Sequence, residues 1–229
     1  MQLGINDIIV ALITGAIPTF LWLWFWLSED RKHPEPRTML VVSFIIGALA
    51  VVITLPLQEA ISSLFISQIS FPFFLSIASV EEIIKFGLIY TFIMLTPFVD
   101  EPIDYAVYLI TGALGFAALE NTLYLLDPLR SVFSNASINI AGLRFLGSTL
   151  LHAVTAAIIG LFLGLVWHRP KRLRVVVFHA GLILAILLHA AFNFFIINGT
   201  NNHIFLSLVS LWIIAILSMY LFERVKRVR

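Results

Sequence analysis

The sequence predicts an all-α, polytopic membrane protein, a helix bundle with about seven membrane spans. Its 229 residues are 60% hydrophobic and only 12% charged, whereas a soluble domain carries about 25% charged residues. The mean hydropathy is +1.02. The apolar residues run in long unbroken stretches, which is typical of membrane spans. We therefore expect one membrane-embedded domain over residues 1–229.

Seven apolar stretches each come close to the ~20 residues that cross the hydrocarbon layer. They cover residues 5–27, 39–57, 72–96, 104–126, 142–167, 175–198 and 203–222. The first is interpreted as a retained span rather than a signal peptide, because no Lys or Arg precedes it and it ends in a Trp-rich segment. The segment Glu59 to Ser70 is too polar and too short to span, which favours an interfacial or re-entrant piece.

Basic residues indicate the orientation. Three clusters follow the first, fifth and seventh stretches: Arg31, Lys32 and Arg37; Arg169, Lys171, Arg172 and Arg174; Arg224, Lys226, Arg227 and Arg229. With seven spans these clusters fall on one side of the membrane, which the positive-inside rule assigns to the cytoplasm. The N-terminus is then outside and the C-terminus cytoplasmic.

Composition also excludes several classes of function. No basic face with interleaved aromatic residues is present, so nucleic acid is not an expected partner. The chain has no cysteine, which excludes disulfides, thiolate metal sites and cysteine nucleophiles.

Polar residues at membrane depth are the main functional signal. A charged side chain at the centre of a span costs about 2.5–3.5 kcal/mol on insertion scales and usually marks function. The predicted spans contain eight conspicuous polar residues: Glu81, Glu82, Lys85, Glu120, Asn121, His152, His189 and Asn193. At ~1.5 Å per residue, Glu81 and His152 lie roughly 15 Å below the outer surface, His189 about 13 Å and Glu120 about 10 Å. Four helices therefore present polar groups at nearly one level, which favours one composite site.

Within the third span, Glu81 and Lys85 are spaced i,i+4, and Glu82 lies three residues before the same lysine. Adjacent helical residues point ~100° apart. One glutamate is therefore expected to face a substrate while the other holds Lys85. Spacing leaves open which glutamate does which.

These motifs resemble the PrsW family of glutamate-type intramembrane proteases, which is related to the CAAX prenyl endopeptidases. The resemblance covers residues 72–198 and rests on Glu81-Glu-Ile-Ile-Lys85, Phe116-Ala-Ala-Leu-Glu120-Asn121, His152 and His189-Ala-Ala-Phe-Asn193. CAAX enzymes have an arginine four residues after the second glutamate and a histidine at the end of the second motif. Here Lys85 and Glu120 stand instead, which favours the PrsW branch.

The resemblance implies hydrolysis of a peptide bond in a membrane-anchored protein or peptide, in a multi-pass protein of a prokaryotic cell membrane. It implies that Glu81 activates a water molecule, and that Glu82 orients the helix of Glu81 or shares a proton with Glu81. Glu120 and His152 would position the water, and His189 and Asn193 would stabilise the oxyanion. Lys85, Phe116 and Asn121 would support these groups.

A metal is a second possibility for the same residues. No cofactor is certain, but two histidines and a carboxylate form a complete zinc set; the ligands would be His152, His189 and either Glu81 or Glu120. Against it, no His-x-x-x-His pair is present on one helix.

Two other functions stay open. Carboxylate and histidine chains also act as proton relays in proton- or cation-coupled transporters, although no inverted repeat is recognisable. A noncatalytic scaffold with the same fold is the third hypothesis. The remaining histidines, His33, His168, His179 and His203, stand near predicted ends and loops and are not assigned to the site. Glycines are expected to permit close helix contacts, at Gly112, Gly115, Gly142, Gly147, Gly160 and Gly164.

Overall fold

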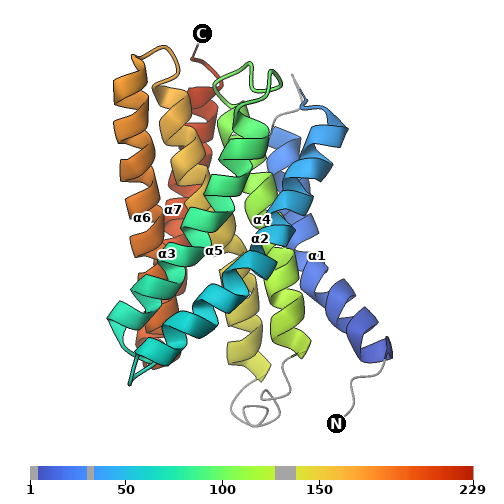
Figure 1. Ribbon diagram of the computed structural model, residues 1–229, viewed down its shortest axis with the longest axis vertical. Coiled ribbons are helices and arrows are strands. Elements are labelled where there is room, and N and C mark those ends of the chain that lie inside the picture. Colours follow the sequence, from blue (N-terminus) through green and yellow to red (C-terminus); the bar gives the residue numbers. More distant parts are fainter. Residues whose placement is uncertain (1–4, 30–33, 127–137, 229) are drawn as a thin grey trace.

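A computed structural model describes residues 5–29, 34–126 and 138–228, with the side chains of Asp7 and of residues 138–146 left out. The described residues form seven α-helices and one π-helical turn, in agreement with the predicted all-α bundle (Figure 1). Their bounds are α1 Ile5–Glu29, α2 Arg37–Leu64, α3 Phe71–Ile89, η1 Tyr90–Met94, α4 Asp104–Leu126, α5 Ile138–Leu165, α6 Lys171–Asn198 and α7 Asn201–Val225.

Six of these helices are long and apolar enough to cross a membrane. The exception is α3, which carries Glu81, Glu82 and Lys85 within its 19 residues. It runs alongside α2 and α6 in the bundle all the same. The helix that is not apolar enough by this measure is thus the one that carries the charges of the predicted site.

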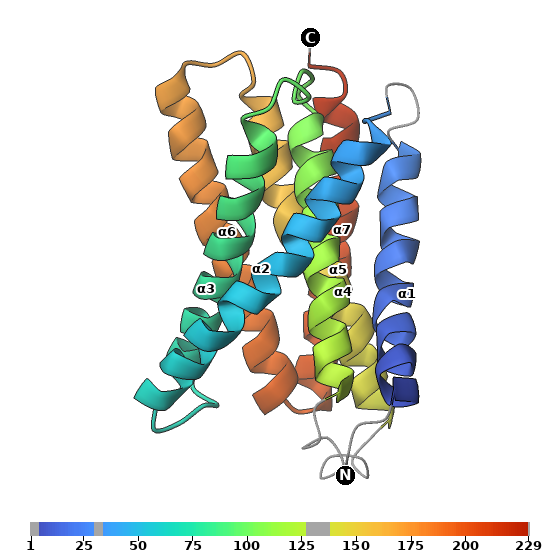
Figure 2. The same cartoon turned by 45° about the vertical axis from the view of Figure 1, so that its right-hand side comes forward.

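The bundle is organised around α4 and α5. Helix α4 packs against α1, α2 and α5, and it is buried continuously from Ala106 to Ala118. By contrast, α1, α2, α6 and α7 expose many large apolar side chains on their outer faces, as lipid-facing helices do. Figure 2 shows α2 crossing the bundle obliquely, with α3 beside its lower half and α4 behind it.

Glycines allow the closest helix contacts, as expected. A Cβ atom added to Gly115 would lie 2.0 Å from the carbonyl oxygen of Phe44, so α2 and α4 touch through their backbones there. At Gly160, a Cβ atom would lie 2.4 Å from Ala106 Cα, which joins α5 to α4 in the same way. Gly47, which the sequence analysis did not single out, meets the carbonyl oxygen of Gly112.

Two predicted boundaries are wrong. Residues 59–64 belong to α2, which runs on without interruption to Leu64, so no separate interfacial or re-entrant piece begins at Glu59. The bend after α2 comes only at residues 65–70, where Ser70 caps the next helix by accepting a hydrogen bond from Phe73 N. Likewise α6 begins at Lys171 rather than near residue 175, because Pro170 sets its first turn. The basic residues of that cluster are therefore helical.

The described parts of the basic clusters lie at one end of the bundle. The start of α2, the α5–α6 connection and the end of α7 are all at the top of Figure 1, whereas α1 begins at the bottom. This arrangement agrees with the orientation drawn from the positive-inside rule. Arg31, Lys32, His33 and Arg229 lie outside the described residues.

Candidate functional site

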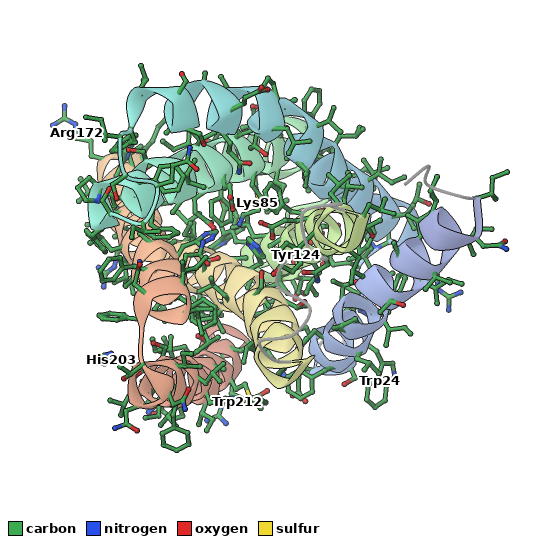
Figure 3. All side chains as sticks on the ribbon, turned by 90° about the horizontal axis from the view of Figure 1, so that it is seen from below. Trp24, Lys85, Tyr124, Arg172, His203 and Trp212 are labelled. Atoms are coloured by element: carbon green, nitrogen blue, oxygen red, sulfur yellow. The ribbon has the colours of Figure 1, made fainter. Side chains whose placement is uncertain are left out.

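Glu82 is the centre of a buried ionic cluster. Lys85 Nζ donates to its Oε1 atom at 2.8 Å, and His189 Nδ1 donates to the same oxygen at 2.7 Å. Glu82 and Lys85 are fully buried, and His189 is nearly so. Both partners compensate the buried carboxylate, which is the condition for keeping such a group inside a bundle. Figure 3 shows Lys85 in the middle of the bundle, whereas Trp24, Arg172, His203 and Trp212 lie at its edge.

Glu81 has one satisfied and one unsatisfied oxygen. Gln58 Nε2 of α2 donates to its Oε1 atom at 2.7 Å. Its Oε2 atom is buried and has no hydrogen-bond partner among the described residues. The nearest basic atom is His189 Nε2 at 3.5 Å. A neutral His189 with its proton on Nδ1 would present the lone pair of Nε2 to Glu81 Oε2, whereas a protonated ring would donate to that oxygen.

His152 of α5 connects α3 with α4. Its Nδ1 atom lies 3.3 Å from Lys85 Nζ, and its Nε2 atom lies 2.8 Å from Glu120 Oε2. An ammonium group only donates, so Nδ1 accepts and Nε2–H donates to Glu120. The Glu120 side chain is 34% exposed, which makes it the most exposed group of this set.

We name Glu81, Glu82, Lys85, Glu120, His152 and His189 the central cluster. Its members come from α3, α4, α5 and α6, and Gln58 adds α2. Phe116 forms one wall: its ring centroid lies 5.2 Å from that of His152 and 5.1 Å from Lys85 Nζ. The convergence expected from equal depth is therefore present in the structure.

Two predicted residues stand apart from the central cluster. Asn121 points to α5, where its Nδ2 atom donates to Thr149 Oγ1 at 2.9 Å, so its contact joins two helices. Asn193 is half-buried one turn after His189, and no hydrogen bond of its side chain is seen in the described part of the chain. His179 and His203 lie outside the cluster, where they bond to Val175 O and Thr200.

Gln58 is a member of this site that was not predicted from the sequence. It stands one residue beyond the predicted end of the second span and directly before the segment interpreted as interfacial, so its depth was not counted. The uninterrupted α2 carries it to the level of Glu81. A polar amide one residue past a predicted span is a signal that could have found it.

The donor set fits a metal ion. Single ligand atoms of Glu81, His152 and His189 all lie within 4.8 Å of one another. A carboxylate with two imidazoles is a zinc set with room for a further ligand. The unpartnered Glu81 Oε2 supports the same conclusion, and Glu82 holds the other nitrogen of His189 as carboxylates do behind metal ligands. His152 differs, because both of its nitrogens already have partners.

Comparison with known proteins agrees with this geometry. A family model described as "PrsW family intramembrane metalloprotease" matches residues 35–221. The chain belongs to the PrsW family. It is therefore a multi-pass integral membrane protein of an intramembrane protease family, as the motif resemblance implied.

Bacterial relatives of the PrsW family are similar over most of their length. Protease PrsW of Oceanobacillus iheyensis is 30% identical over 214 residues, which cover 90% of this chain and 94% of the relative. Protease PrsW of Bacillus subtilis is 29% identical over 202 residues, 86% of this chain and 88% of the relative. That of Clostridioides difficile is 26% identical, over 80% and 77% of the two chains. No solved structure matches the chain.

Proposed function

We propose that this PrsW-family protein hydrolyses a peptide bond of a membrane-anchored protein or peptide, with a water molecule activated in the central cluster. The observation that supports this most directly is the convergence of Glu81, His152 and His189, whose ligand atoms lie within 4.8 Å of one another, beside the partly exposed Glu120. Glu81 Oε2 is buried without a hydrogen-bond partner among the described residues and lies 3.5 Å from His189 Nε2.

Glu81, His152 and His189 would hold a metal ion, with zinc the best match to the donors. Such an ion would supply Lewis-acid activation of the water and of the scissile carbonyl. His152 is the ligand that must give up a contact, since its Nε2–H donates to Glu120. Gln58 fixes the first oxygen of Glu81, and Glu82 fixes the ring of His189.

Glu120 would accept the proton of the attacking water and pass it to the leaving amine. It is the most exposed carboxylate of the cluster, and it lies against His152. Glu82 does not suit this role, because it is fully buried and its Oε1 atom already accepts from Lys85 and His189. Both nitrogens of His189 face carboxylates, so Asn193 is left as the donor to the developing oxyanion, a role that amide side chains perform.

The experiment combines metal analysis with cleavage of a membrane-anchored peptide by the purified protein. We expect stoichiometric metal in the wild type, and loss of both metal and cleavage in Glu81→Gln and His189→Ala. Glu120→Gln should keep the metal and lose about 10²–10⁴-fold in rate, the usual contribution of a general base. His203→Ala, on the lipid-facing side of the bundle, is the matched control and should keep both.

The opposite outcome is equally specific. Cleavage at the full rate by metal-free wild-type protein in chelator would contradict the metal site. Glu81 would then be assigned as the general base. Cleavage that survives Glu81→Gln and Glu120→Gln would reject a mechanism based on either carboxylate.

A further inference from the structure

A polar cavity lies at the basic end of the bundle, away from the central cluster. It has a volume of about 510 Å³ and is lined by residues of η1, α4, α5 and α6. This is within the ~300–1,000 Å³ range of small-molecule sites. Its polar lining consists of Lys171, Arg174, His179, Tyr90 and Tyr105, and no carboxylate lines it. The chemistry is that of an anion site.

The two cations of this cavity lack acidic partners. No ion pair joins Lys171 or Arg174 to a carboxylate among the described residues. Arg174 contacts the hydroxyl of Tyr105, yet its Nε atom is buried and has no hydrogen-bond partner. Both cations also stand in the first turn of α6, where the helix dipole disfavours positive charge and favours a bound anion.

The positive-inside rule accounts for basic residues at this end of the bundle, but it does not explain why two of them line the cavity. Arg169 and Arg172 belong to the same cluster and do not line the cavity, whereas the exposed Lys171 and the half-buried Arg174 do. Arg172 extends from the edge of the bundle in Figure 3. Topology is served equally well by either pair, so the position of Lys171 and Arg174 against the cavity needs a different explanation.

The rest of the lining suits an amphiphile. Leu95, Leu163, Val175 and Phe178 form an apolar side. Tyr105 packs edge-on against Trp167 with ring centroids 5.3 Å apart, an aromatic pair of the kind found at the membrane interface. Tyr90 and Leu95 reach the cavity because α3 ends in the π-helical turn η1, and such turns are frequent at functional sites.

We propose that this cavity binds the phosphate group of an anionic phospholipid, with Lys171 and Arg174 as the phosphate ligands and the apolar side against the glycerol and acyl chains. Basic pockets between membrane helices on the cytoplasmic side bind lipid head groups in this way. His179 adds a third polar contact: its Nδ1–H donates to Val175 O at 2.7 Å, and Nε2 remains for a ligand. The site is independent of peptide cleavage.

The test measures the melting temperature of the delipidated protein in neutral detergent. Phosphatidylglycerol should raise the melting temperature, because a ligand that binds only the folded state stabilises it, whereas phosphatidylcholine at the same mole fraction should not. The Lys171→Gln/Arg174→Gln variant should lose the phosphatidylglycerol shift. The control variant Arg169→Gln/Arg172→Gln removes the same charge from the same segment and should keep the shift.

Glycerol 1-phosphate distinguishes the two sources of the phosphate. No shift with it, together with a shift with phosphatidylglycerol, identifies a lipid site. An equal shift with glycerol 1-phosphate would identify a site for a soluble phosphate ester and overturn the lipid assignment. An unchanged phosphatidylglycerol shift in Lys171→Gln/Arg174→Gln, or its loss in both double variants, would overturn the site itself.

Discussion

Two buried polar clusters occupy the same helix bundle, and they differ in how their groups face one another. The central cluster brings imidazoles and carboxylates from four helices to one point. The second, which we name the end cluster, contains Glu35, Asp104 and Tyr108 near the basic end. There the Tyr108 hydroxyl donates to Glu35, and Asp104 Oδ2 accepts from the backbone N–H groups of Asp100 and Glu101 at 2.8 and 2.7 Å.

The partners explain the difference. In the end cluster, the carboxylates meet a hydroxyl, backbone N–H groups and each other, and these contacts hold the start of α4 to the segments beside it. In the central cluster, ligand atoms of Glu81, His152 and His189 lie within 4.8 Å of one another. Each cluster contains a buried carboxylate oxygen without a hydrogen-bond partner among the described residues, on Asp104 and on Glu81. Such an oxygen alone therefore does not distinguish the two clusters, whereas the two imidazoles beside Glu81 do.

The largest effect of a substitution is expected at Glu82, in the central cluster. The Glu82→Ala substitution should lower the free energy of unfolding by about 3–5 kcal/mol, because it leaves Lys85 buried without its counter-ion. Cleavage should be lost as well. The melting temperature in detergent and cleavage of a membrane-anchored peptide are the measurements.

A second substitution separates these two effects. Glu82→Ala combined with Lys85→Met removes both charges and should recover most of the stability. It should recover none of the cleavage, because the His189 ring still lacks the carboxylate that fixes its position. Wild-type cleavage in the double variant would show that Glu82 serves the fold alone.

The next largest effect is expected at Gln58, which holds Glu81 from α2. Gln58→Ala should reduce cleavage by about 10–100-fold, as removal of groups behind a metal ligand does, while the melting temperature changes little. Gln68→Ala is the matched control: Gln68 is exposed and bonds to Ser62 O, so its loss should leave the rate unchanged. Equal rates for both variants would contradict a role for Gln58.

The smallest effect is expected in the end cluster. Tyr108→Phe removes one hydrogen bond to Glu35 and should cost about 1 kcal/mol of stability. The cleavage rate per folded molecule should not change. Tyr220→Phe, at an exposed position, serves as the reference for melting temperature. A fall in cleavage with Tyr108→Phe would mean that the two clusters are coupled through α4, which carries residues of both.

Much of this arrangement could be predicted from the sequence, because hydropathy fixes where helices lie along the membrane normal. Depth counting is enough to bring Glu81, Glu120, His152 and His189 to one level, and the PrsW resemblance is confirmed. Rotation about each helix axis is not fixed by depth. For that reason spacing did not distinguish Glu82, held by Lys85 and His189, from Glu81, held by Gln58. It also did not separate Asn121, which bonds to Thr149, from the residues of the site.

The charges of α3 have a consequence for biogenesis. An isolated α3 would carry three charged side chains into lipid, each at about 2.5–3.5 kcal/mol on insertion scales. Its compensating groups arrive in a fixed order during synthesis: Gln58 before it, and Glu120, His152 and His189 only later. We therefore expect α3 to enter the membrane as a hairpin with α2 and to settle only after α6 has emerged. The residues that form the site therefore also determine at what stage of synthesis the helix bundle can assemble.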